Sequence, residues 1–485
     1  MPKRKFVEPS STESVIDIDE HLAALFERNP RATRPKFNKA EFDAKKSVIF
    51  QAIDVKGVLD TSNKNWTHDL KGVPENLPPN RNGGVPIVHA YGVNEKGQSV
   101  CAHVHGYRPY IYMKQPVTYN PDIHNEALKV VLDALIKNEG RGKACGNPVV
   151  KIESMLKKPL YNFSEEDKSP HLKITLAVQE IVTCTRRIIE DNRVARPFNQ
   201  KIKDDFDMVF DQRTFESNID FEVRFMVDTQ LYGCSWMECK DVYLRKHDEK
   251  ETTAQIEIDV GLKNVVGYFP EGEWSKNAKT RILSFDIECI SGDGRFPDAT
   301  KLTDKCIQIS CVLQEFQNPD YLLKVVLCLH DTDPMSDCSV VWFKTEQELL
   351  LGFRDLLQIT DPDYVTGYNI QNFDFPFLVD RAKTLVKAKI SSEVANFGQF
   401  TRWKAKTANY SIKKFQSKQM GNKENYEMVI DGRIIGSIRN FKTQFEYLLL
   451  KLGGVTWLQI YRVFHSISFE AVPRFKFIRF LVSFN

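Results

Sequence analysis

Residues 282–289 read Ile282-Leu283-Ser284-Phe285-Asp286-Ile287-Glu288-Cys289. Apolar and polar side chains alternate along this stretch, which is the period of a β-strand with one buried face. Asp286 and Glu288 therefore lie on the face opposite Phe285, roughly 6.6 Å apart along the strand. Two carboxylates at this spacing repel each other unless a cation lies between them. The pair thus indicates a site for hard divalent ions such as Mg²⁺ or Mn²⁺, and the alternative is an acidic strand end facing solvent.

A third carboxylate follows a second strand, in Gly367-Tyr368-Asn369-Ile370-Gln371-Asn372-Phe373-Asp374. We predict that the strand ends near Tyr368 and that a helix begins near Pro376 after a short polar turn. Asp374 then lies at the N-terminus of that helix. A plain helix cap would account for an aspartate there, but it does not require the asparagines and the phenylalanine beside it. Carboxylates so placed fit a two-metal site, in which ions roughly 3.5–4 Å apart hold a phosphate between them.

The elements around these carboxylates follow a pattern typical of a mixed sheet. Strands are expected at 282–289, 306–313 and 321–329, followed by a helix, a strand at 364–368 and a second helix. A capping box, Thr345-x-x-Glu348, precedes the apolar face of the first helix. Three strands followed by helix, strand and helix favour an α/β domain with helices packed on the sheet.

The residues before this domain show a different order of predicted strands and helices. Residues 46–275 predict an α+β domain, with a strand beginning at Val48 and a helix that Asn120 caps and Pro121 opens. Residues 221–227 read as another strand.

The first 45 residues are polar and charged, and we expect residues 1–45 to be a largely disordered segment. One short amphipathic piece, from Asp17 to Arg28, is interpreted as a nascent helix. Within the first 45 residues, Lys3, Arg4 and Lys5 form a candidate nuclear-import signal. A chance basic start is the alternative.

Composition excludes several classes of protein. The chain has 485 residues, of which 42% are hydrophobic and 27% charged, a globular balance for about three domains. Its net charge of +3 is too small to demand a polyanionic partner. No stretch approaches the ~20 apolar residues of a membrane helix, so no membrane association is expected. The ten cysteines include no C-x-x-C pair, which favours reduced thiols over a zinc site.

The two carboxylate motifs match a known family. Phe285-Asp286-Ile287-Glu288 and the stretch 367–374 resemble the first two exonuclease motifs of family B DNA polymerases. Longer stretches at 218–229, 233–236 and 415–421 resemble a eukaryotic branch of the same family. The resemblance runs from about Val48 to Arg433.

The resemblance implies that residues 276–435 form a ribonuclease H-like 3′–5′ exonuclease domain, following the family's α+β N-terminal domain at 46–275. In that family the domain proofreads newly made DNA with two divalent cations, Mg²⁺ or Mn²⁺. Carried over by position, Asp286, Glu288 and Asp374 would be the catalytic metal ligands.

The resemblance also implies binding partners. Asn369 and Phe373 would contact the frayed primer end, where aromatic stacking tolerates any base. The partners would be a DNA primer-template with its single-stranded 3′ end, accessory polymerase subunits and a sliding clamp. The implied location is the nucleus.

Two features depart from the family pattern. Its third exonuclease motif, Tyr-x-x-x-Asp, does not occur after Asp374, and its palm motifs for polymerisation are missing. Residues 436–485 contain two acidic residues, seven basic residues and eight phenylalanines, and fit no element of the family. We interpret 436–485 as a divergent tail, for which a gene-model artefact is one explanation and a real helix around 445–452 the other.

The leading interpretation is an N-terminal part of a replicative family B polymerase that itself hydrolyses DNA poorly, because it lacks the fourth carboxylate. Two alternatives stay open. One is a non-catalytic fragment that binds DNA or subunits. The other is a free-standing ribonuclease H-like exonuclease, whose completing ligand would have to be Asp431, Glu446 or Glu470.

Overall fold

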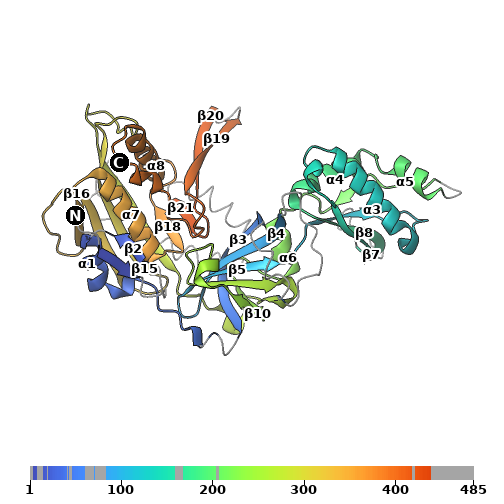
Figure 1. Cartoon of the computed structure of the whole chain (residues 1–485), viewed down its shortest axis with the longest axis horizontal. Coiled ribbons are helices and arrows are strands. Elements are labelled where there is room, and N and C mark those ends of the chain that lie inside the picture. Colours follow the sequence, from blue (N-terminus) through green and yellow to red (C-terminus); the bar gives the residue numbers. More distant parts are fainter. Residues whose placement is uncertain are drawn as a thin grey trace, which may run out of the picture.

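Three sheets and the helices packed on them make up most of the described chain (Figure 1). The computed structural model describes residues 4–7, 15–18, 20–40, 42, 46–60, 70, 84–158, 168–203, 207–417 and 421–437. We refer to residues 281–437 as the C-terminal unit and to residues 47–267 as the N-terminal unit. Within the described ranges, no helix has the length and apolar character needed to cross a bilayer.

The C-terminal unit is built on a six-stranded mixed sheet with the order β17-β16-β15-β14-β18-β21. The central strand β14 pairs antiparallel with β15 and parallel with β18. The expected strands are confirmed, while β17 and β21 are additional short strands at the two edges. The bounds are β14 Arg281–Ile290, β15 Lys305–Glu315, β16 Tyr321–Leu329, β17 Ser339–Phe343, β18 Tyr364–Gly367 and β21 Ile434–Ser437.

Two helices, α7 (Glu346–Thr360) and α8 (Asp374–Lys387), pack on this sheet. The expected capping box is present, because Glu348 donates its backbone N–H to Thr345 Oγ1 at 3.4 Å and accepts from the Thr345 N–H at 3.0 Å. Arg381 on α8 forms a buried ion pair of 2.7 Å with Glu346 on α7. The two helices are therefore tied to each other as well as to the sheet.

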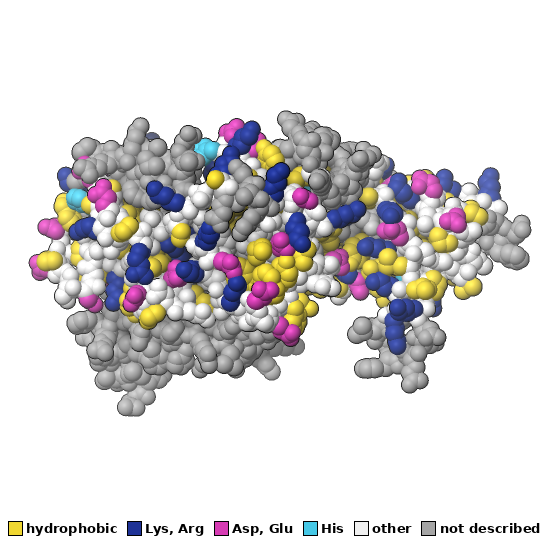
Figure 2. Space-filling view, turned by 90° about the horizontal axis from the view of Figure 1, so that it is seen from below, with side chains coloured by type: hydrophobic (Ala, Val, Ile, Leu, Met, Phe, Trp, Pro, Cys, Tyr) yellow, Lys and Arg dark blue, Asp and Glu magenta, His cyan; other side chains and the backbone are white. Residues whose placement is uncertain are grey.

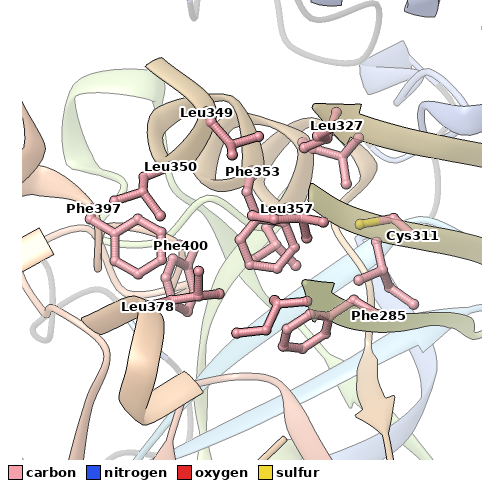
Figure 3. Close-up of a cluster of buried hydrophobic side chains, with 14 of the residues drawn as sticks. Phe285, Cys311, Leu327, Leu349, Leu350, Phe353, Leu357, Leu378, Phe397 and Phe400 are labelled. Atoms are coloured by element: carbon pink, nitrogen blue, oxygen red, sulfur yellow. The ribbon is translucent and has the colours of Figure 1, made fainter. Parts of the chain in front are cut away.

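The apolar face of β14 lies against these helices, as its alternation predicts. Phe285 is 3% exposed. Its ring centroid lies 5.0 Å from that of Phe353 on α7 and 4.9 Å from that of Phe375 on α8. Figure 3 shows side chains from strands and helices converging in this core. The polar face of β14, with its two carboxylates, consequently points away from the core.

Helix α1 (Glu20–Arg28) confirms the helix expected within residues 17–28. It also belongs to the same core, so the prediction of a largely disordered segment over residues 1–45 is wrong for this part of the chain. Leu22 is fully buried and Phe26 is 2% exposed. The ring of His21 lies 4.9 Å from that of Trp342 on β17. Polar composition favours disorder, but a few apolar residues at helical spacing are enough to dock a short helix on a sheet.

The N-terminal unit contains two sheets with separate apolar cores. One is seven-stranded with the order β11-β12-β5-β4-β3-β10-β13, and the other is four-stranded with the order β7-β8-β6-β9. Helices α3 and α4 pack on the second sheet, α5 packs on α3, and together they form a lobe at the far end of the molecule (Figure 1). Strand bounds are β3 Ser47–Asp60, β4 Val85–Asn94, β5 Ser99–His105, β6 Tyr110–Lys114, β7 Val149–Lys157, β8 Ser169–Leu176, β9 Thr214–Phe215, β10 Trp236–Lys240, β11 Tyr243–Leu244, β12 Ile256–Gly261 and β13 Val265–Gly267. Helix bounds are α3 Pro121–Asn138, α4 Val182–Glu190, α5 Ala195–Ile202 and α6 Phe221–Asp228.

The prediction of a strand at 221–227 is wrong, because this segment forms helix α6. Phe221, Arg224 and Phe225 are its buried residues. Their spacing is that of one helix face rather than of a strand. The helix at Pro121 is confirmed, with Asn120 accepting from the Asp122 N–H at 3.1 Å.

A buried ionic cluster, which we call the arginine cluster, consists of Asp361, Asp363, Arg34, Arg402 and Arg433. Asp361 accepts hydrogen bonds from Arg34 at 2.7 Å, Arg402 at 2.9 Å and Arg433 at 2.7 Å. Asp363 accepts from Arg34 and Arg402, each at 2.6 Å. The two aspartates immediately precede β18, so the cluster anchors the start of that strand to three other segments of the chain.

The cluster also reaches the N-terminal unit, because Arg34 donates to the backbone oxygen of Gly97 at 2.7 Å. Burial alone would raise the pKa of Asp361, but Arg402, Arg34 and Arg433 outweigh burial and hold that pKa well below its usual range. A carboxylate with a depressed pKa stabilises the fold at neutral pH, and this stabilisation is lost as the pH falls below about 4.

We predict that Asp363→Ala lowers the free energy of unfolding by about 3–5 kcal/mol, because it leaves the buried guanidinium groups of Arg34 and Arg402 to share Asp361 with Arg433. Urea unfolding followed by tryptophan fluorescence measures this change. Asp320→Ala removes an exposed aspartate and serves as the control. A loss for Asp363→Ala no larger than that of the control would contradict the role given to the cluster.

Candidate active site

Asp286 and Glu288 lie on the polar face of β14, as predicted. Asp286 is half-buried and Glu288 is exposed. The position opposite Asp286 on β15 is Ser310, whose hydroxyl donates to the Asp286 backbone oxygen at 3.3 Å. A register shift between Glu288 and Cys289 interrupts the pairing with β15 directly after the second carboxylate, and the pairing resumes at Cys289. The strand therefore presents two acidic side chains close to its C-terminal end.

Asp374 is the first residue of α8 and is only 2% exposed. The N-cap residue is Phe373, without a side-chain cap bond, so Asp374 does not serve as the plain cap considered above. Its Oδ1 instead accepts a hydrogen bond of 3.3 Å from the backbone N–H of Ile287, between the two carboxylates of β14. The structure thus brings Asp374 to the strand that carries Asp286.

Burial, together with the neighbouring Asp286, which is also its hydrogen-bond partner, raises the pKa of Asp374 to about 7. Two adjacent carboxylates, one of them almost fully buried, cannot both be ionised cheaply without a positive charge. Oxygen ligands of this kind fit Mg²⁺ or Mn²⁺. The residues present therefore fit a divalent cation at this position.

Glu288 does not complete a three-carboxylate cluster with Asp286 and Asp374. Across the described residues, Asp286, Glu288 and Asp374 do not bring ligand atoms within 4.8 Å of one another as a set of three. A set that does is His103, Glu251 and Glu257 in the N-terminal unit. There Arg245 is the counter-ion, at 2.9 Å from Glu251 and 3.1 Å from Glu257, so that cluster already holds a cation.

The two DNA-contact candidates lie in the turn before α8. Asn369 accepts at its backbone oxygen from the N–H groups of Asn372 and Phe373, each at 3.0 Å. The ring of Phe373 lies 5.2 Å from that of Phe296, which is 75% exposed. Phe373 is thus partly covered by a second aromatic ring that faces solvent. Sequence reasoning missed Phe296, although its place soon after the first motif is a usable signal.

Phe296 belongs to a loop that Asp304 holds in shape. Asp304 accepts from the backbone N–H of Gly292 at 3.0 Å and from that of Asp298 at 2.9 Å. Arg381 of α8 donates to the backbone oxygen of Lys301 at 2.6 Å. The loop is therefore tied to the helix that begins with Asp374.

A hairpin also borders the site, formed by β19 (Asn409–Ser417) and β20 (Gly421–Val429). Figure 1 shows it projecting from the C-terminal unit. At its base the N–H of Tyr426 donates to Asn372 Oδ1 at 3.4 Å, and the Tyr410 hydroxyl donates to Asp380 of α8 at 2.5 Å.

The candidate completing ligands do not add a described carboxylate to the site. Asp431 forms ion pairs of 2.6 Å with Lys56 and 2.9 Å with Lys406. Although burial opposes the effect, these lysines lower the pKa of Asp431 below its usual value. Glu446 and Glu470 lie outside the described residues, as does the segment 445–452. Gly436 and Ser437, expected in the divergent tail, are part of β21.

Comparison with known proteins agrees with this geometry. Residues 212–436 match the family model described as DNA polymerase family B, exonuclease domain. The C-terminal unit, with its mixed sheet and flanking helices, therefore has the ribonuclease H-like exonuclease fold of that family.

Individual relatives show which kind of family B polymerase the chain resembles. The chain is 35% identical over 391 residues to the DNA polymerase delta catalytic subunit of Bos taurus, covering 80% of this chain and 33% of the relative. It is 33% identical over 398 residues to that of Drosophila melanogaster, covering 81% and 34%. The chain thus resembles the delta catalytic subunit and spans about a third of the length of these relatives.

A solved structure, the family B DNA polymerase from the hyperthermophilic archaeon Pyrobaculum calidifontis, matches with a TM-score of 0.45 and 19% identity. The match covers 82% of this chain and 38% of that one.

We predict that Asp374→Asn stabilises the chain at pH 8 when divalent ions are removed with EDTA. The pKa of Asp374 is raised to about 7, so between pH 4 and 7 the folded state holds a proton that the unfolded state has lost. Stability should therefore fall as the pH rises through this window. Removing the charge of Asp374 should raise the free energy of unfolding at pH 8 by about 1–4 kcal/mol and should weaken its dependence on pH.

Thermal unfolding at pH 5 and pH 8 measures both effects, with Asp337→Asn, an exposed aspartate, as the matched control. Mn²⁺ should raise the melting temperature of the wild type more than that of Asp374→Asn. A variant that is less stable than the wild type at pH 8 in EDTA would contradict the claim that the metal-free Asp374 carboxylate destabilises the fold.

Proposed function

We propose that this chain is the N-terminal part of a DNA polymerase delta catalytic subunit, and that its C-terminal unit acts on DNA as a 3′–5′ exonuclease with two divalent cations. The observation that supports the proposal most is the meeting of Asp374 with Asp286, directly after Phe373 and its contact with the exposed ring of Phe296. In the whole protein this activity would proofread DNA-templated DNA synthesis.

Each residue would have a distinct task. Asp286 and Asp374 would hold the ions, and Glu288 would supply oxygen atoms from the exposed end of the same strand face. Bound divalent cations would polarise the scissile phosphodiester and activate a water molecule. Phe373, together with Phe296, would stack the terminal base so that its phosphate lies over the carboxylates.

Asn369 would orient the frayed end from the same turn, where it is half-buried and its side-chain oxygen accepts from the Asn372 side-chain amide at 3.4 Å. The trimming should be slow in this chain, because no fourth carboxylate joins Asp286 and Asp374 among the described residues. Losing one ligand weakens one of the two cation sites and with it the electrostatic stabilisation of the transition state.

A second candidate function is binding of DNA or of polymerase subunits without turnover. The observation that favours it is Asp431, which is committed to Lys56 and Lys406 rather than to the carboxylate site. The same observation weighs against a free-standing exonuclease completed by Asp431.

The wider setting is part of the same proposal and rests on the resemblance to the delta catalytic subunit. Accessory polymerase subunits and a sliding clamp would be the protein partners, primer-template DNA the nucleic-acid partner, and the nucleus the location. Of the candidate import residues, Lys3 lies outside the described residues, and the structure describes Arg4 and Lys5 only in their backbone, as part of strand β1 (Arg4–Val7).

The test is the removal of nucleotides from a single-stranded oligonucleotide labelled at its 5′ end, with Mg²⁺, Mn²⁺ or EDTA. We expect slow trimming with either metal and none with EDTA. Asp286→Ala and Asp374→Ala should each lower the rate at least 100-fold, since they remove the ions' ligands.

Asp320→Ala, at an exposed turn, is the control and should trim like the wild type. Binding of the oligonucleotide without any metal-dependent trimming would favour the non-catalytic function. Trimming that is unchanged in Asp286→Ala would overturn the assignment of the site.

A further inference from the structure

A pocket of about 580 Å³ lies away from the carboxylates, where residues 30–36 cross the start of the C-terminal unit. Its charged lining is strongly biased. Five basic residues face a single acidic one: Arg31, Arg34, Lys36, Lys279 and Arg281 against Glu315. On the face drawn in Figure 2, basic and acidic side chains are interspersed.

Arg281 and Arg34 form the buried floor, and each is 3% exposed. The Arg281 guanidinium donates to the backbone oxygens of Ala32 at 2.8 Å and Thr33 at 2.6 Å, and its hydrogen bonds are to carbonyls rather than to a carboxylate. Burial, and then the neighbouring Arg34, lower its pKa to about 9. Among the described residues, no carboxylate accepts from this guanidinium, although Asp363 accepts from the Arg281 backbone N–H at 2.7 Å, so the floor holds a desolvated positive charge.

The carboxylates that pair with Arg34 do not neutralise the positive charge of the floor. These carboxylates, Asp361 and Asp363, are shared with Arg402 and Arg433. Three guanidinium groups thus face two carboxylates directly behind the pocket, and the field at the floor is positive.

Arg31, Lys36 and Lys279 form the rim, and all three are exposed. Within the part of the chain that the structure describes, none of them is ion-paired. Flexible cations at the mouth of a pocket with a fixed positive floor are suited to a ligand that carries several negative charges. Pro35 and Leu322 add apolar surface to the lining.

We propose that this pocket binds a small polyphosphate, such as the triphosphate chain of a nucleotide. Arg281 and the three rim residues exceed Glu315 by three positive charges, which matches a polyphosphate better than the single charge of a phosphodiester. The volume lies in the range of small-molecule sites. The apolar lining would contact the base or sugar. This site is independent of the exonuclease proposed above.

Isothermal titration of the whole chain with tripolyphosphate and with ATP, in EDTA so that the carboxylate site holds no metal, tests the proposal. The test variant is Arg31→Gln/Lys36→Gln/Lys279→Gln, which changes exposed residues only. Lys137→Gln/Arg141→Gln/Lys143→Gln removes the same charges from exposed positions in the lobe of α3 and is the matched control.

We expect the rim variant to bind tripolyphosphate at least ten-fold more weakly than the wild type, and the control to bind it like the wild type. ATP bound more tightly than tripolyphosphate would identify a nucleotide as the ligand, and equal affinities a free polyphosphate. Equal weakening in both variants would overturn the proposal, as would wild-type binding of single-stranded DNA without binding of tripolyphosphate.

Discussion

Asp361 and Asp363 are buried beside three arginines that come from residue 34, before the first sheet, and from residues 402 and 433, near the end of the described chain. A buried charge without a partner strongly lowers the free energy of unfolding, so these segments are expected to fold cooperatively. The two aspartates fix the start of β18, and the turn after β18 delivers Phe373 and Asp374. The geometry of the candidate active site therefore depends on charges that lie outside it.

The site itself works against stability. Asp374 is buried beside Asp286 and close to the backbone of β14, where its pKa is raised to about 7. A fold keeps such a pair only if the rest of the structure over-determines its position. The core behind β14 supplies that constraint, with Phe285 between Phe353 and Phe375. Electrostatic strain of this kind would be relieved by a divalent cation.

Much of this arrangement could be predicted from sequence, because local periodicity carries it. The alternation around Phe285 placed Asp286 and Glu288 on the polar face, and the capping box at Thr345 marked the start of α7. Long-range effects could not be predicted. Polar composition concealed the docking of α1, and nothing local indicates that Asp431 pairs with Lys56 of the other unit.

The most direct measurement is a crystal structure of the chain soaked in Mn²⁺, with anomalous diffraction locating the metal. We predict an anomalous peak within coordination distance of both Asp286 and Asp374, and Glu288 turned towards it or towards a second peak. A structure with Mn²⁺ bound only elsewhere, for example at His103 and Glu257, or with the carboxylates of Asp286 and Asp374 turned apart, would contradict it.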